Sequence, residues 1–249
     1  MEIDVALVPS EARRWDRTVC IVIDELRASS TITTLLDLGC DRVYLTVGLR
    51  AARAIAREHH GLLAGERHGY APPGFDFDNS PAAISRGDVR GRVVVLSTTN
   101  GTRVLSHLTA APATLVGCLL NARACAEAAV RLAHSLDARV GIICAGTEDR
   151  FAIEDGVTAG VFIERLIEAV RARGGSHTLT EGAMAAVRLR ESYPDLLTLM
   201  RESVSGELVT MLGAGDDVPF CARLDVSTTV PVLRPGVPLS VERLAAQDA

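Results

Sequence analysis

The sequence predicts an α/β protein: a layered α/β/α sandwich with a mixed, mostly parallel sheet and a helical hairpin near the C-terminus. Apolar runs typical of buried strands alternate with stretches of helical periodicity through residues 3–172. Three of these strands end in short polar segments that lead directly into a helix. Residues 178–212 then carry two helices rich in Ala, Leu and Met, with Tyr193 and Pro194 at the joint.

The first part of the chain predicts strands and helices in alternation. Pro9 ends the first strand and Gly39 ends the first helix. The expected strands are residues 3–8, 19–23 and 41–47, and the expected helices are 31–38 and 49–58.

Residues 62–85 break this rhythm, and we name them the site loop. They contain a Pro-Pro-Gly sequence, two aspartates and an Asn-Ser-Pro sequence, together with three aromatic residues that favour an ordered structure. A long irregular segment inside a compact domain is usually functional. We therefore expect the site loop to line a binding site.

The alternation resumes after the site loop. The expected strands are 92–96, 114–116 and 139–145, and the expected helices are 103–108, 122–135 and 153–172. Residues 216–232 predict a turn, a short strand or helix and a last extended segment, and we expect the tail from Arg234 to lie on the surface.

Length and charge limit the classes of function. The 249 residues, 48% of them hydrophobic, fit one α/β domain over residues 1–249 or two closely packed lobes. A formal charge of −5 argues against a nucleic-acid partner. No apolar run reaches membrane-spanning length and the N-terminus lacks a signal-peptide core, so we expect a cytoplasmic protein without a membrane partner. A homodimer through the helical hairpin is compatible with the frequency of symmetric assemblies.

The three polar segments that follow strands, which we call crests, point to a shared binding site. The first crest is residues 24–31, the second is 97–103 and the third is 146–151. In an open α/β sheet, segments at the carboxyl ends of the strands converge on a ligand crevice. The small hydroxyl residues and Asn-Gly turn of the second crest suit phosphate binding at a helix start.

The residue types at these places favour metal-assisted attack on a phosphate ester. The chain has no Lys, which excludes Schiff-base chemistry and a Walker-type phosphate loop, so an anion must be held by Arg, backbone amides or metal. Mg²⁺ needs only a few carboxylates together with substrate oxygens. Candidate carboxylates are Asp24, Glu66, Asp76, Asp78, Glu148, Glu154, Asp155 and Asp225, and candidate arginines are Arg27, Arg67, Arg103 and Arg150.

Other catalytic signatures are weaker. Asp76 and Asp78 form a DxD pair, but they follow Pro-Pro-Gly, whereas the dehalogenase-type motif ends an apolar strand. Cys144 and Arg150 have the spacing of a cysteine phosphatase loop, but the two acids between them would repel a phosphate, and a packed thiol is the simpler interpretation. The histidines show no zinc-binding spacing, and there is no GxGxxG sequence.

Seven blocks of sequence in order resemble the 2-phosphosulfolactate phosphatase family of coenzyme M biosynthesis. They are IDELRASSTI (23–32), GER (65–67), PGFDFDNSP (73–81), STTNGTR (97–103), LLNA (119–122), CAGTEDRFAIEDG (144–156) and FCARLDVSTTVP (220–231). The resemblance implies a Mg²⁺-dependent enzyme that hydrolyses 2-phospho-3-sulfolactate to 3-sulfolactate and phosphate on an α/β/α fold. Arg-only basic usage indicates a GC-rich bacterial source outside the methanogens, so other small phosphorylated 2-hydroxy acids are alternative substrates.

The resemblance also implies roles for individual residues. We expect catalytic roles for Asp24, Arg27 and Glu154, metal binding by Asp24, Glu66, Asp76, Asp155 and Asp225, and substrate binding by Thr99, Asn100, Gly101, Thr102, Arg67, Asn79 and Ser80. The nucleophile stays open between a metal-activated water, Asp24 and Cys144. The alternative function is a non-catalytic protein that binds a small phosphorylated or sulfonated anion. The density of carboxylates at the crests favours an enzyme, since a simple anion binder has little use for them.

Overall fold

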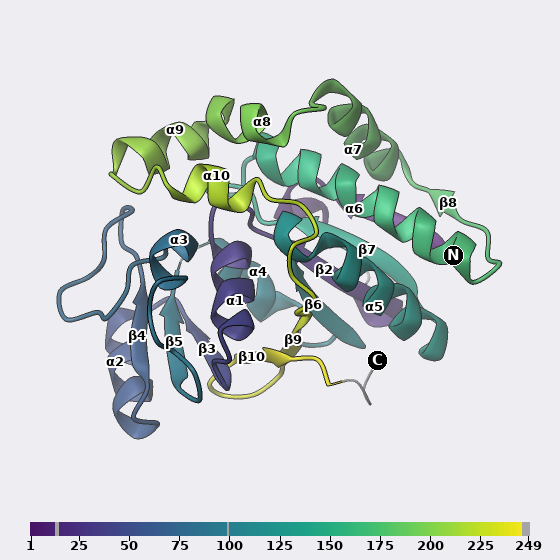
Figure 1. Cartoon of the computed structure of the whole chain (residues 1–249). Helices are drawn as coiled ribbons and strands as arrows, with labels where there is room; N and C mark the ends of the chain where they lie inside the picture. The colour runs from purple at the N-terminus through teal and green to yellow at the C-terminus, as the bar shows by residue number, and fades with distance from the viewer. Residues whose placement is uncertain (13–14, 99, 246–249) are drawn as a thin grey trace.

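A single sheet of ten strands organises the computed structural model, which describes residues 1–12, 15–98 and 100–245, without the side chain of Asn100 (Figure 1). In sheet order the strands are β4 (Leu62–Gly65), β5 (Val93–Ser97), β3 (Arg42–Thr46), β10 (Ser240–Arg243), β9 (Pro231–Arg234), β6 (Ala113–Gly117), β2 (Thr18–Ile23), β7 (Arg139–Cys144), β1 (Glu2–Ala6) and β8 (Thr178–Leu179). The predicted layered α/β fold with a mixed, mostly parallel sheet is therefore confirmed.

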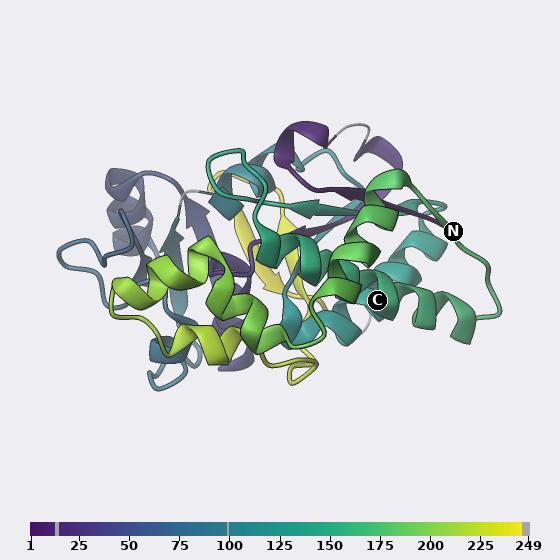
Figure 2. The ribbon, with the colours of Figure 1, turned by 90° about the horizontal axis from the view of Figure 1, so that it is seen from above.

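The sheet consists of two parallel groups joined by an antiparallel hairpin. Strands β4, β5 and β3 form one group, and β6, β2, β7, β1 and β8 form the other. The hairpin of β9 and β10 pairs antiparallel with β6 on one side and β3 on the other. Figure 2 shows this hairpin, in yellow, in the interior of the molecule.

Helices cover both faces of the sheet. α5, α6 and α7 pack on the larger strand group, α1 and α4 pack on its other face, and α2 packs on β3, β4 and β5. The helices are α1 (Ala28–Asp37), α2 (Leu49–Glu58), α3 (Pro81–Ile84), α4 (Asn100–His107), α5 (Ala122–Ser135), α6 (Ile153–Ala172), α7 (Glu181–Ser192), α8 (Leu196–Glu202), α9 (Val204–Met211) and α10 (Asp217–Cys221), with 3₁₀ turns at Pro9–Glu11, Trp15–Arg17 and Leu119–Asn121. In the part of the chain that the structure describes, no helix is long and apolar enough to cross a membrane.

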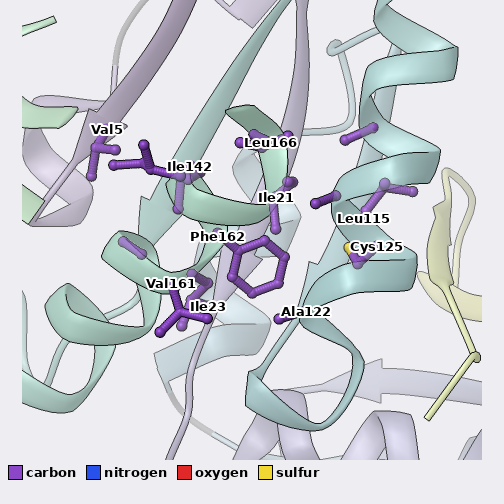
Figure 3. Packing of buried hydrophobic residues seen from close by; sticks show 14 of the residues in the cluster. Val5, Ile21, Ile23, Leu115, Ala122, Cys125, Ile142, Val161, Phe162 and Leu166 are labelled. Atoms are coloured by element: carbon purple, nitrogen blue, oxygen red, sulfur yellow. The ribbon is translucent and has the colours of Figure 1, made fainter. Parts of the chain in front are cut away.

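The largest core cluster lies between β2, β6 and β7 and the helices α5 and α6. The ring of Phe162 is fully buried there and lies among Ile21, Leu115 and Ala122 (Figure 3). A Cβ atom at Gly117 would approach the ring to 2.5 Å, so this strand end needs glycine. Dense packing of this kind fixes the position of the β2 carboxyl end, where the first crest begins.

Several sequence predictions need correction in the second half of the chain. The site loop begins with strand β4 and ends with helix α3, so only residues 66–80 are irregular. The expected pair of helices over 178–212 is a run of three, because Ser203 caps a separate helix α9, and α7 packs mainly on α6. The tail from Arg234 contains β10, whose Val241 is fully buried at the centre of the sheet.

Candidate functional site

A cavity of about 370 Å³ lies where the crests meet the site loop and helix α9. Its lining residues are Asp24, Leu26, Arg27, Glu66, Arg67, His68, Gly69, Asn79, Thr98, Thr147, Glu148, Val204, Ser205, Leu208, Val209 and Leu212. Both overall views place α9 beside the loop that follows β4 (Figures 1 and 2). A larger cavity of about 580 Å³ near Met1 contains none of the predicted site residues, so the cavity at the crests is the candidate site.

Asp24 is held rigidly at the carboxyl end of β2. Its Oδ1 accepts a hydrogen bond from the Ala28 amide at 3.2 Å, and its Oδ2 accepts one from the Gly101 amide at 2.9 Å. Burial raises the pKa of Asp24 to about 6 against the opposing effect of these amides, and repulsion from Glu154 and Glu66 raises the pKa further. The bond to Gly101 also connects the first and second crests, although their strands belong to different parallel groups.

Two carboxylates of helix α6 lie behind Asp24. Asp155 accepts from the amides of Glu25 and Gly146, both at 2.9 Å, and so ties the first crest to the third. Burial raises the pKa of Asp155 well above its usual range, and repulsion from Glu154 and Asp24 adds to the effect. Burial also raises the pKa of Glu154, whose ionised form the hydroxyls of α9 stabilise. Both side chains are 3% exposed and lie outside the cavity lining.

Glu25 is a further buried carboxyl at this strand end, which the sequence predictions did not single out. It accepts from the Leu119 amide at 3.0 Å and lies 3.2 Å from the Ser30 hydroxyl. Burial raises the pKa of Glu25 to about 8. It therefore fastens the first crest to the segment after β6 as a neutral acid at pH 7.

The two predicted arginines of the site have different partners. Arg27 forms a buried ion pair with Asp217, with 2.8 Å between Nη1 and Oδ2. Arg67 donates to the carbonyl oxygens of Glu66, Ser97 and Val47, which hold it at the ends of three neighbouring strands. Among the described residues no carboxylate lies within ion-pair distance of Arg67. Arg67 therefore brings to the cavity a positive charge that no described carboxylate pairs with, whereas the charge of Arg27 is paired with Asp217.

The second crest and the site loop add polar groups to the cavity. Thr98 lines the cavity, and its hydroxyl lies 2.9 Å from that of Thr102, a predicted substrate ligand that is buried outside the cavity lining. Asn79 is 5% exposed, and its side-chain oxygen has no hydrogen-bond partner among the residues that the structure describes. The predicted substrate ligands Thr99 and the side chain of Asn100 lie outside the described part of the chain.

Four other predicted site residues lie outside the cavity lining and form hydrogen bonds or ion pairs with other parts of the protein. Asp76 accepts from the Leu63 amide at 2.8 Å within the site loop. Asp225 forms an ion pair with Arg165 at 2.8 Å. The remaining two are Ser80, which caps α3 and donates to Asp217, and Gly101, whose amide is used by Asp24.

Cys144 is an unsuitable nucleophile in this structure. Its side chain is fully buried at the end of β7, outside the cavity lining. Burial and the nearby Asp155 raise the pKa of the thiol far above its usual range. A cysteine nucleophile needs the thiolate, so this residue is a packed core thiol.

The cavity offers few donor groups for a magnesium ion. In the described ranges, no three His, Cys, Asp or Glu side chains lie close enough together to form a protein-only metal site. Mg²⁺ usually keeps several waters and binds one or two carboxylates together with substrate phosphate. Asp24 and Glu66 line the cavity and supply such hard oxygen donors, so the residues fit a substrate-assisted site.

One wall of the cavity is apolar and has no obvious sequence signal. Val204, Leu208 and Leu212 line it from α9 and its end, and Val204 is 81% exposed. The spacing of these residues is that of any amphipathic helix, so the sequence alone does not separate a cavity wall from core. Asp217 was missed for a similar reason, since an acid in the first turn of a helix is commonly only a cap.

Together, the fold and the site define a layered α/β protein with a cavity lined by carboxylates and arginines at its strand ends. The sequence profile of the family described as 2-phosphosulpholactate phosphatase matches residues 5–236. A probable 2-phosphosulfolactate phosphatase of Thermus thermophilus is 38% identical over 94% of this chain and 95% of its own. A probable 2-phosphosulfolactate phosphatase of Deinococcus radiodurans is 38% identical over 92% of this chain and 93% of its own.

The 2-phosphosulfolactate phosphatase of Methanothermobacter thermautotrophicus is 38% identical over 88% of each chain. The chain therefore belongs to the 2-phosphosulfolactate phosphatase family, and the resemblance seen in the seven sequence blocks is confirmed.

Proposed function

We propose that this protein is a phosphoric monoester hydrolase that releases phosphate from 2-phospho-3-sulfolactate or a closely related phosphorylated 2-hydroxy acid. The observation that carries the proposal is Asp24, a carboxylate fixed by two backbone amides at the wall of a cavity that also presents Arg27 and Arg67. The names of the family and of its relatives support the same reaction.

Different residues of the cavity would bind the phosphate and the rest of the substrate. Arg27 and Arg67 supply positive charge for the phosphate and the second acidic group of the substrate. The unpaired oxygen of Asn79 accepts a hydrogen bond from a bound water or from the hydroxyl of the product. The apolar side chains of α9 form a wall that offers water no hydrogen-bonding groups.

Asp24 and Glu66 would hold Mg²⁺, the cofactor that we propose for the reaction. The ion would supply charge neutralisation of the phosphate and activation of water. Asp24 is half protonated near pH 6 because of its raised pKa, and a bound cation would favour its ionised form. The expected cytoplasmic location, the homodimer and the absence of nucleic-acid partners stay predictions.

The test is phosphate release from a panel of phosphorylated 2-hydroxy acids, with and without EDTA, by the wild type and by Asp24→Asn. We expect turnover that EDTA abolishes and added Mg²⁺ restores, and a loss of kcat of about 10³-fold or more in Asp24→Asn. The Asn NH₂ group faces one of the two backbone amides that Asp24 accepts from, so the variant should melt at a lower temperature than the wild type but stay folded in the assay. Stabilisation by phosphorylated ligands without turnover would identify a non-catalytic binder instead. Full activity of Asp24→Asn would refute the proposed site.

A further inference from the structure

Asp217 is a fully buried carboxylate that the proposed reaction does not use directly. Its Oδ2 accepts from Nη1 of Arg27 at 2.8 Å. Its Oδ1 accepts from the Ser80 hydroxyl at 2.6 Å and from the Ala82 amide at 3.0 Å. These three bonds join helix α10, the first crest and the end of the site loop, which are far apart in the sequence.

The two oxygens of the Asp217 carboxylate hold two different parts of the cavity wall. Arg27 lines the cavity yet is only 5% exposed, so its guanidinium depends on a buried acceptor for its position. With Nη1 fixed, its remaining N–H groups can be directed at an anion. Ser80 follows Asn79, another lining residue, so the Oδ1 contacts fix the backbone that carries the Asn79 amide.

We infer that Asp217 is a positioning residue for substrate binding, which aims Arg27 and the Asn79 corner of the cavity at the anionic groups of the substrate. This inference rests on the proposed function, in which Arg27 binds the phosphate. Asp217 itself does not line the cavity. Its effect therefore has to pass through Arg27, and this dependence can be measured.

The substitution Asp217→Asn separates the two sides of the carboxylate. Oδ1 accepts two hydrogen bonds and Oδ2 accepts one, so the Asn oxygen keeps its place opposite Ser80 and Ala82. The new NH₂ group then faces Arg27, donor against donor, and displaces the guanidinium. We expect KM for the phosphate ester to rise about 10- to 100-fold, the range for loss of one charge-assisted hydrogen bond, while kcat changes by less than about threefold.

Asp216→Asn is the matched control. Asp216 is the neighbouring aspartate, but it is exposed, and its ion pair with Arg86 is long, at 3.6 Å. We expect wild-type KM and kcat from this variant. A double-mutant cycle with Arg27→Gln then tests the route of the effect, because Asp217→Asn should raise KM no further once Arg27 has been removed.

An unchanged KM in Asp217→Asn would overturn the inference. It would also be overturned if Asp217→Asn raised KM by the same factor in the Arg27→Gln protein as in the wild type. Arg27→Lys serves if Asp217→Asn does not fold. The donors of Lys lie on a single nitrogen of a shorter side chain, so they cannot hold Asp217 and reach a phosphate as the guanidinium fork does; the same rise of KM is expected, and a wild-type KM refutes the inference. A wild type without phosphatase activity would refute the proposed function alone. Calorimetric Kd values for inorganic phosphate, measured with the same variants, would then test the positioning role.

Discussion

Replacing Glu25 by Gln should remove a pH-dependent loss of stability. Burial raises the pKa of Glu25 from its ordinary value of 4.5 to about 8, so the folded protein retains a proton that the unfolded chain releases. The stabilisation from this raised pKa is complete below pH 4.5 and is lost as the pH rises toward 8. Gln matches the neutral acid, because its oxygen can accept from the Leu119 amide and its NH₂ group can donate to the Ser30 hydroxyl.

The size of the effect follows from the pKa difference. A shift from 4.5 to about 8 corresponds to about 5 kcal/mol over the whole range, of which about 4 kcal/mol falls between pH 5 and pH 8. The free energy of unfolding of the wild type should fall by about that amount relative to Glu25→Gln over this interval. Ionisation of groups that do not interact with Glu25 affects both proteins equally and cancels in the difference, whereas its neighbour Glu154 contributes to the measured effect.

Urea unfolding of both proteins at pH 5, 6, 7 and 8 measures this difference. Glu58→Gln, at an exposed position near the end of α2, is the control and should follow the wild type at every pH. A difference between wild type and Glu25→Gln that stays constant across the series would show that Glu25 does not retain its proton in the folded protein.

Three further substitutions test other parts of the structure. Gly101→Ala places a Cβ atom 2.9 Å from Oδ2 of Asp24 and should displace this carboxylate. We expect kcat/KM to fall at least about tenfold with little change in melting temperature. An unaltered kcat/KM would show that catalysis does not depend on this contact. Asp225→Asn breaks a partly buried ion pair and should lower the free energy of unfolding, measured in urea, by about 1–2 kcal/mol. If the variant instead needs a tenfold or greater Mg²⁺ concentration for half-maximal activity, Asp225 has the metal-binding role expected from the sequence. Gly117→Ala forces a methyl group to within 2.5 Å of Phe162 and should lower the free energy of unfolding by about 1–3 kcal/mol. Thermal unfolding at the wild-type temperature would show instead that the ring moves aside.

The parts of the fold that sequence predicts well are those with strong periodicity. The helices at 49–58, 122–135 and 153–172 begin and end where the structure places them, because their apolar spacing is regular and Gly174 and Gly175 follow the last of them. Strand β4 was missed because four residues next to a Pro- and Gly-rich loop give no alternating pattern. Strand β10 was missed for two reasons. One of its two neighbours in the sheet, β3, lies far from it in the sequence, so no local pattern indicates the pairing. In addition, a Pro-containing tail resembles a surface segment.

The candidate site could be predicted only in part. Asp24, Arg27, Glu66, Arg67 and Asn79 lie in or beside recognisable sequence blocks, and all five line the cavity. What the pattern could not supply was the partner of each group: that Asp217 pairs with Arg27, for example, depends on a contact across 190 residues. Charge and spacing indicate which residues are available for chemistry, whereas tertiary packing decides which of them face the cavity.

The position of the β9–β10 hairpin has a consequence for biosynthesis. These strands follow all the others in the sequence yet fill the middle of the sheet, between β3 and β6. While a ribosome is still making residues 231–243, the nascent chain exposes two unpaired strand edges, each able to pair with another chain. A variant that lacks the hairpin should therefore aggregate instead of yielding a smaller soluble enzyme, and this protein depends on residues 231–243 to close its sheet.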